Sequence, residues 1–190
     1  MTVPADPLTV AREVIEVFEK LGARYSIGGS LASAFAGEPR STLDVDIVVA
    51  LTSSQADVLA DELSDSFYLD RTRLQEAVAM HRSVNLIHHE TSIKIDLFIA
   101  GGTPLDDELL RRRRPVVVGH PPVEIFVHTP EDILLQKLRW FRLGGEMSDR
   151  QWRDVRAIVE VQGTRLDREY LDEGAAKLGV TDLLTRALTK

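Results

Sequence analysis

The sequence predicts an α+β protein, with a mixed β-sheet and flanking helices followed by a C-terminal helical lobe. Two observations predict this class. Short apolar runs typical of strands recur between helical patterns as far as residue 127. From residue 130 onward only the helical period remains, with apolar residues every three or four positions. We therefore expect a core domain of residues 1–129 and a helical lobe of residues 130–190.

The expected elements of the core domain follow from caps and periodicity. Asp6 and Pro7 predict the start of a helix that ends at Gly22, because Asp favours the N-cap and Pro the first helical position. A second helix is expected to begin at a serine cap, Ser53. The expected helices cover residues 7–21, 31–35, 53–65, 74–80 and 104–113. The expected strands cover residues 24–28, 45–51, 67–69, 84–88, 93–99, 116–118 and 123–127.

The helical lobe is also distinct in its charge. Its expected helices cover residues 130–143, 148–162, 168–178 and 181–188. Residues 131–190 hold 11 basic and 11 acidic residues, so residues 1–130, with 12 basic and 19 acidic, carry the whole net charge of -7. This acidic balance argues against broad nonspecific binding of nucleic acid.

The composition excludes several classes of protein. The chain has no cysteine, so it forms no disulfide and no thiolate metal site. No apolar run reaches the roughly 18–20 residues that a membrane-spanning helix needs, and the N-terminus lacks the pattern of a signal peptide. We expect a cytoplasmic protein that makes no contact with a membrane. The five histidines lack the spacing of a zinc site, and His88 with His89 is expected in an exposed turn.

Two carboxylates at the start of the strand at 45–51 are candidate metal ligands. Residues two apart in a strand share a face, so Asp44 and Asp46 point the same way and Val45 points to the other side. Their like charges repel, which a cation such as Mg²⁺ would relieve. Asp96, in another apolar strand, could complete a site for one or two ions. The alternative is that Asp44 and Asp46 are ordinary solvent-facing residues at a strand entry.

Gly28, Gly29 and Ser30 follow one expected strand and precede a helix. A turn of this kind lets backbone N–H groups and a hydroxyl approach a phosphate at the helix N-terminus. The same three residues also occur in ordinary turns.

These motifs together resemble a known fold. Gly29-Ser30, thirteen residues, Asp44-Val45-Asp46 and a later strand with Asp96 resemble the nucleotidyltransferase fold of the DNA polymerase β superfamily. The stretch GGSLA…PRSTLDVDIVV is similar to the AbiEii-type toxins of abortive-infection systems and their MenT-like relatives, in which Arg40 and Thr42 belong to the motif.

The resemblance implies a nucleotidyltransferase-like sheet and transfer of a nucleoside monophosphate from an NTP to a hydroxyl. It implies that Asp44, Asp46 and Asp96 are catalytic and bind Mg²⁺. It further implies that the nucleotide contacts Gly28, Gly29, Ser30, Arg40, Thr42, Lys137 and Asp154.

Lys137 and Asp154 each also have an explanation that does not involve a nucleotide. Lys137 falls inside the apolar face of its expected helix, so it either extends its ammonium to the rim or meets an anion, for which the resemblance suggests a triphosphate. Asp154 lies four residues after Arg150, a spacing that also suits a surface ion pair.

The acceptor stays open at this point. The resemblance suggests RNA, with tRNA as one candidate, as the target of a toxin that has a cognate antitoxin protein. A small-molecule acceptor, as in antibiotic-modifying relatives, fits the acidic net charge at least as well. A third reading is a non-catalytic nucleotide-binding regulatory protein. Arg111 to Arg114 could contact RNA phosphates, but a solvated helix end explains the run equally well.

Overall fold

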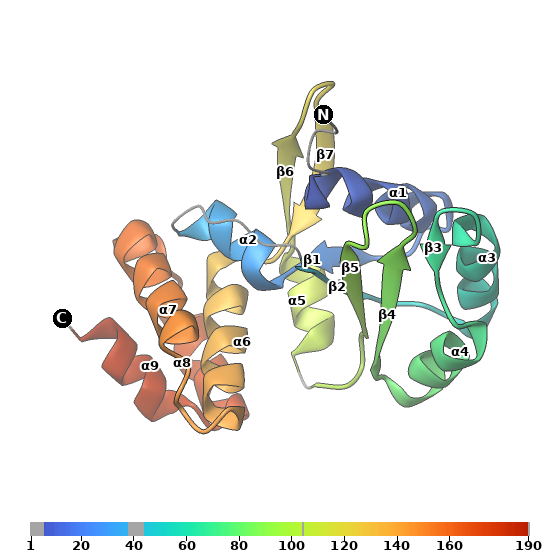
Figure 1. Cartoon of the computed structure of the whole chain (residues 1–190). Coiled ribbons are helices and arrows are strands. Elements are labelled where there is room, and N and C mark those ends of the chain that lie inside the picture. The colour runs from blue at the N-terminus through green and yellow to red at the C-terminus, as the bar shows by residue number, and fades with distance from the viewer. Residues whose placement is uncertain (1–5, 38–43, 104, 190) are drawn as a thin grey trace. The chain divides into compact units, whose positions relative to one another are not determined.

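The computed structural model describes residues 6–37, 44–103 and 105–189 (Figure 1). The chain divides into two compact units, the first of residues 1–31 and 41–127 and the second of residues 32–40 and 128–190. One of the three breaks along the chain falls inside helix α2 (Gly29–Ala36), and another follows the last strand. The expected domains, a core of residues 1–129 and a helical lobe of residues 130–190, stay a prediction.

Seven strands within the described residues form one mixed sheet in the order β3-β4-β5-β2-β1-β7-β6. The strands are β1 (Tyr25–Ile27), β2 (Asp44–Val49), β3 (Phe67–Tyr68), β4 (Ser83–His88), β5 (Lys94–Ile99), β6 (Arg114–Val118) and β7 (Val123–Val127). The pairs β2–β5 and β1–β7 are parallel, and the other neighbours are antiparallel. This sheet and the helices around it confirm the predicted α+β class.

The two faces of the sheet in the first unit are covered differently. On one face, Val45, Ile47 and Val49 of β2 are buried together with Ile95 and Leu97 of β5. Helix α1 (Pro7–Lys20) packs on this face, since the ring of Phe18 lies 5.8 Å from that of Tyr25, the partner of Val49 in the register.

On the opposite face, helix α5 (Asp106–Arg112) covers only one end of the central strands. Its residues Leu109 and Leu110 form a buried cluster with Val48, against which Phe98 packs. Val48 and Phe98 are partners in the β2–β5 register. The other end of this face carries the carboxylates.

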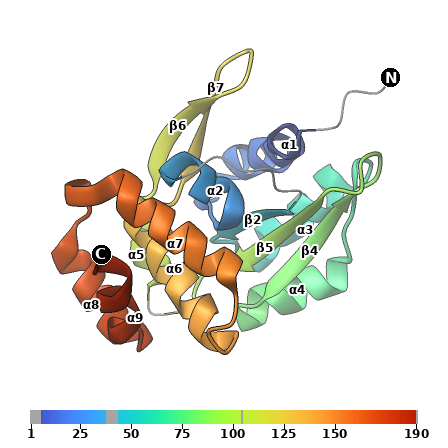
Figure 2. The same ribbon diagram turned by 60° about the vertical axis from the view of Figure 1, so that its left-hand side comes forward.

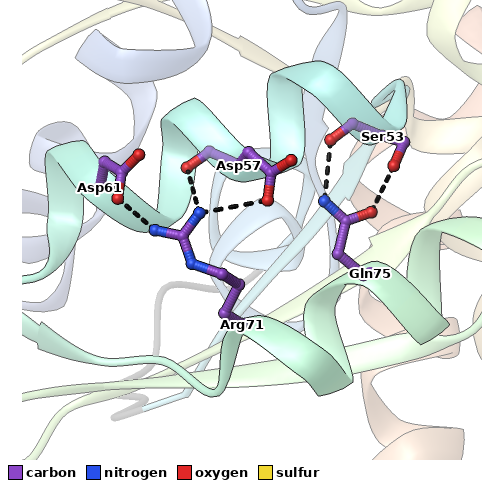
Figure 3. A network of polar contacts seen from close by, with 5 residues as sticks. All are labelled: Ser53, Asp57, Asp61, Arg71 and Gln75. Carbon is purple, nitrogen blue, oxygen red and sulfur yellow. Dashed lines mark hydrogen bonds and ion pairs between the residues drawn. The ribbon is translucent and has the colours of Figure 1, made fainter.

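Helices α3 (Ser53–Leu63) and α4 (Arg71–Met80) are joined by polar contacts (Figure 3). The Arg71 guanidinium bridges the carboxylates of Asp57, 3.1 Å away, and Asp61. One turn further along, Gln75 donates to the carbonyl of Ser53 at 2.9 Å and accepts from its hydroxyl at 2.5 Å. These contacts fix the register of the two helices.

Two sequence-based expectations in this region are wrong. Thr52, not Ser53, caps α3, because Thr52 and Gln55 bond each other's backbone N–H groups in a capping box. His88 does not lie in an exposed turn. It ends β4 with its ring buried 5.0 Å from that of Phe67, and its Nδ1 pairs with the Thr91 hydroxyl.

The second unit contains helices α6 (Pro130–Leu143), α7 (Asp149–Gln162), α8 (Arg168–Leu178) and α9 (Thr181–Leu188), with a short 3₁₀ turn (Gly163–Arg165) after α7. Helices α6 and α7 lie side by side (Figure 2). Ile133 of α6 and Ile158 of α7 are buried against Ala32 and Ala36 of α2. Among the described helices, none is both long and apolar enough to cross a membrane.

Candidate active site

Three carboxylates share one face of the sheet in the first unit. Strands β2 and β5 are parallel, and their register pairs Asp46 with Asp96 and Asp44 with Lys94. Neighbouring strands lie about 4.8 Å apart, so the side chains of a pair such as Asp46 and Asp96 are direct neighbours. The structure therefore brings the three predicted metal ligands onto a single surface.

That surface is open at the carboxylates and closed beyond them. Asp44 is exposed, and Asp46 and Asp96 are half-buried. Two residues further along each strand, Val48 and Phe98 meet helix α5. The covered end is packed against a helix, and exposure increases along the surface towards Asp44, from which a ligand could approach.

A lysine that the sequence analysis overlooked lies among these carboxylates. Lys94 Nζ is 2.8 Å from Asp96 Oδ2. The hydrogen bond to Asp96 raises the pKa of Lys94, and the charges of Asp96, Asp44 and Asp46 raise it further. The two-residue period of a strand could have predicted this position, since Lys94 is two residues before Asp96 and so shares its face.

The donor set suits a hard divalent cation, although its present arrangement is centred on the lysine. Carboxylate oxygens from Asp46 and Asp96, side by side on rigid strands, are ligands that Mg²⁺ prefers. Within the described part of the chain, no group of three or more His, Asp or Glu side chains is already arranged to hold a metal ion. The assignment of Asp44, Asp46 and Asp96 as metal ligands and catalytic residues stays a prediction.

The predicted phosphate turn lies directly against Asp46. The Gly28 N–H donates to the Asp46 carbonyl at 2.8 Å, and helix α2 begins at Gly29. Gly29 has φ +56°, and a Cβ there would lie 2.5 Å from Asp46 Cγ and 2.9 Å from its Cβ. Only glycine satisfies both the backbone angle and this close approach. The half-buried Ser30 follows in the same first turn.

The remaining predicted nucleotide contacts divide into two groups. Arg40 and Thr42 fall outside the described residues. Lys137 of α6 and Asp154 of α7 meet within the second unit, where Lys137 Nζ donates to Asp154 Oδ2 at 2.8 Å. The anion beside Lys137 is thus an internal carboxylate, and Arg150, four residues before Asp154, is exposed.

Comparison with solved structures identifies the class of fold. No family model matches the chain, and no curated protein matches its sequence. An antigenic nucleotidyltransferase-like protein from Paracoccidioides brasiliensis matches with a TM-score of 0.57 and 17% identity over 98% of this chain and 94% of that one. The chain therefore has a nucleotidyltransferase-like fold.

An antibiotic-resistance factor and an antibiotic adenylyltransferase also share this fold. The antibiotic-resistance factor ANT(2'')-Ia matches with a TM-score of 0.59 and 10% identity over 94% of this chain and 96% of its own. A lincosamide antibiotic adenylyltransferase matches with a TM-score of 0.50 and 12% identity over 80% of this chain and 95% of its own.

Proposed function

We propose that this protein is a nucleotidyltransferase that moves a nucleoside monophosphate from an NTP to a hydroxyl group. The observation that carries the proposal is the in-register pair of Asp46 and Asp96 beside the glycine turn at the start of α2. Carboxylates for a cation and backbone N–H groups for phosphates are then neighbours on one surface. The fold shared with nucleotidyltransferases supports the same reading.

In the proposed reaction the acceptor oxygen bonds to the α-phosphorus, the bond from that phosphorus to the bridging oxygen breaks, and pyrophosphate leaves. Bound Mg²⁺, one or two ions, would offset the negative charge on the phosphates. Asp44 and Asp46 would hold it, and Asp96 would complete the set and accept the proton of the attacking hydroxyl. Gly29, through its backbone N–H, and the Ser30 hydroxyl would bind the outer phosphates, while Gly28 would hold the turn against β2 through its hydrogen bond to the Asp46 carbonyl.

Four further residues belong to this proposal on the strength of the family resemblance. Lys137 would support the triphosphate, and Asp154 would belong to the same part of the site. Arg40 would bind a phosphate or support the loop before β2, and Thr42 would belong to that loop.

Two classes of acceptor are compatible with the proposed reaction. An RNA acceptor such as tRNA, with a cognate antitoxin protein as partner, follows from the AbiEii and MenT-like resemblance. A small-molecule acceptor is favoured by the acidic net charge and by the antibiotic-resistance factor and the antibiotic adenylyltransferase that share the fold. We place the small molecule second only because the sequence motifs are closer to the toxin branch.

The test is incubation with each α-labelled NTP and Mg²⁺, in the presence of total tRNA or of a panel of hydroxyl-bearing antibiotics. The label is expected on one acceptor class, and Asp46→Asn is expected to lower the transfer about a hundredfold or more. Asp65→Asn, which removes an exposed carboxylate of the same unit, is the control and should leave transfer unchanged. NTP binding without transfer to any acceptor would favour the regulatory protein, and no NTP binding would reject the proposal.

A further inference from the structure

The ammonium of Lys94 contacts one oxygen of Asp96, a predicted ligand of the divalent cation. Its Nζ is 2.8 Å from Asp96 Oδ2, and the register places Lys94 opposite Asp44. The Asp96 side chain is 16% exposed, so water shields this contact less than it shields a surface pair. A positive charge thus already lies on one oxygen of the predicted ligand set.

The Lys94 contact differs from the other lysine–carboxylate pairs on exposed surface. Lys20 and Glu62 are 3.3 Å apart with 66% and 46% of their side chains exposed, and Lys177 and Glu173 are 3.9 Å apart with 56% and 64% exposed. Exposed pairs of this kind contribute little. Lys94 instead contacts the carboxylate that pairs with Asp46 across the strands.

We propose that Lys94 is an internal counter-ion of the sheet face that carries Asp44, Asp46 and Asp96, and that it competes with the divalent cation for Asp96. The inference rests on the proposed function, because it assumes that this face binds a cation. Without a cation, the ammonium offsets the repulsion among the carboxylates. When a cation binds, the ammonium has to leave Asp96, since two positive charges at that distance repel strongly.

The side chain is suited to such an exchange. Lys94 is 39% exposed, so its ammonium can turn into solvent without movement of the strand. A lysine carries a compact charge on a flexible four-carbon stem, and it makes no fixed planar contact that would have to break. The strand backbone on both sides of Asp46 and Asp96 can therefore stay as it is.

The experiment measures the binding of Mn²⁺ alone, by the loss of the free-ion signal in electron paramagnetic resonance. Lys94→Met removes the charge but keeps the length, and it is expected to tighten Mn²⁺ binding about tenfold or more relative to the wild type. Without a cation, the same variant should unfold at a lower temperature, and saturating Mn²⁺ should raise its midpoint more than that of the wild type. Lys94→Arg keeps the charge and should bind Mn²⁺ as weakly as the wild type.

The matched control is Lys20→Met, which removes another ion-paired lysine of the same unit and should leave Mn²⁺ binding unchanged. Equal Mn²⁺ affinity in Lys94→Met and the wild type would overturn the inference and leave the cation site standing. Weaker binding in Lys94→Met would overturn it in the other direction, because Lys94 would then support the site. If neither protein binds Mn²⁺, the inference is also rejected, whereas the labelling assay decides separately whether nucleotide transfer occurs.

Discussion

Lys137 Nζ lies 2.8 Å from Asp154 Oδ2, and the two side chains are only 10% and 9% exposed. The pair joins α6 to α7 at a depth where an isolated charge is costly. Burial of both partners makes each depend on the other, because removal of either takes away a charge-assisted hydrogen bond that water does not replace at this depth.

This dependence predicts a large loss of stability from either single substitution. Lys137→Met and Asp154→Asn are each expected to lower the free energy of unfolding by about 3–5 kcal/mol. The double variant Lys137→Met/Asp154→Asn should lose clearly less than the sum of the two, since the second substitution removes a partner of a contact that the first has already broken. Urea unfolding monitored by circular dichroism measures all three.

Lys177→Met is the control for these unfolding measurements. It breaks an exposed pair of the same unit, between Lys177 and Glu173, and should leave the midpoint nearly unchanged. If the double variant loses as much unfolding free energy as the two single variants together, Lys137 and Asp154 do not depend on each other.

The double variant also tests the proposed nucleotide contact of Lys137. The unfolding curve shows under which conditions the double variant is folded, and under those conditions its NTP affinity reports on contact with the ligand and not on unfolding. If Lys137 supports the triphosphate, isothermal titration should show NTP binding weakened about tenfold or more relative to the wild type. Unchanged affinity would make the Lys137–Asp154 pair purely structural.

The sequence predicted the helices best where caps and periodicity agree. The expected bounds 130–143 and 168–178 are those of α6 and α8, and the side chains of Thr129 and Asp167 cap them. Helix α4 is longer than expected and begins at Arg71, because its first turn is polar and carries no apolar signal. The side chain of Asp70 caps it, which is the local signal that could have extended the prediction.

The contacts of the site were harder to predict from the sequence than the helices, because they join residues that are far apart in the chain. The strand period places Asp44 and Asp46 on one face, but only the β2–β5 register determines that Asp46, not Asp44, lies beside Asp96. The contact of Lys137 with Asp154 likewise depends on how two helices pack. The spacing of Arg150 and Asp154 suggested a different partner, since local spacing says nothing about the depth of a side chain.

Gly29→Ala tests the close approach between the glycine turn and Asp46. An added methyl group would clash with the whole Asp46 side chain, including its Cβ. Because the strand backbone fixes the position of that Cβ, a change of the Asp46 rotamer cannot relieve the contact. We expect lower stability and loss of NTP binding.

Gly22→Ala separates this effect from backbone strain. Gly22 has φ +63° and nothing within 4 Å of an added Cβ, so its substitution should cost only about 1–2 kcal/mol and leave NTP binding intact. Urea unfolding and isothermal titration compare the two variants. Equal effects of both substitutions on NTP binding would mean that the contact with Asp46 does not shape the site.

The complete burial of His128 should make the stability of the protein depend on pH. Complete burial lowers the pKa of His128 to about 3 in the folded protein, against an ordinary value of 6.5. Below about pH 6.5 the unfolded chain therefore binds a proton that the folded chain does not. The contribution of neutral His128 is fully present above that pH and is lost as the pH falls toward 3.

From pH 7 to pH 5 this linkage should cost about 2 kcal/mol of unfolding free energy. The measurement is urea unfolding at pH 5, 6 and 7 for the wild type and for His128→Gln, whose shallower pH dependence should differ from the wild type by that amount. The carboxylates titrate in both proteins, so the difference isolates the histidine. His89→Gln, which removes an exposed histidine, should retain the wild-type dependence, and parallel curves for the wild type and His128→Gln would mean that His128 takes up its proton in the folded state as well.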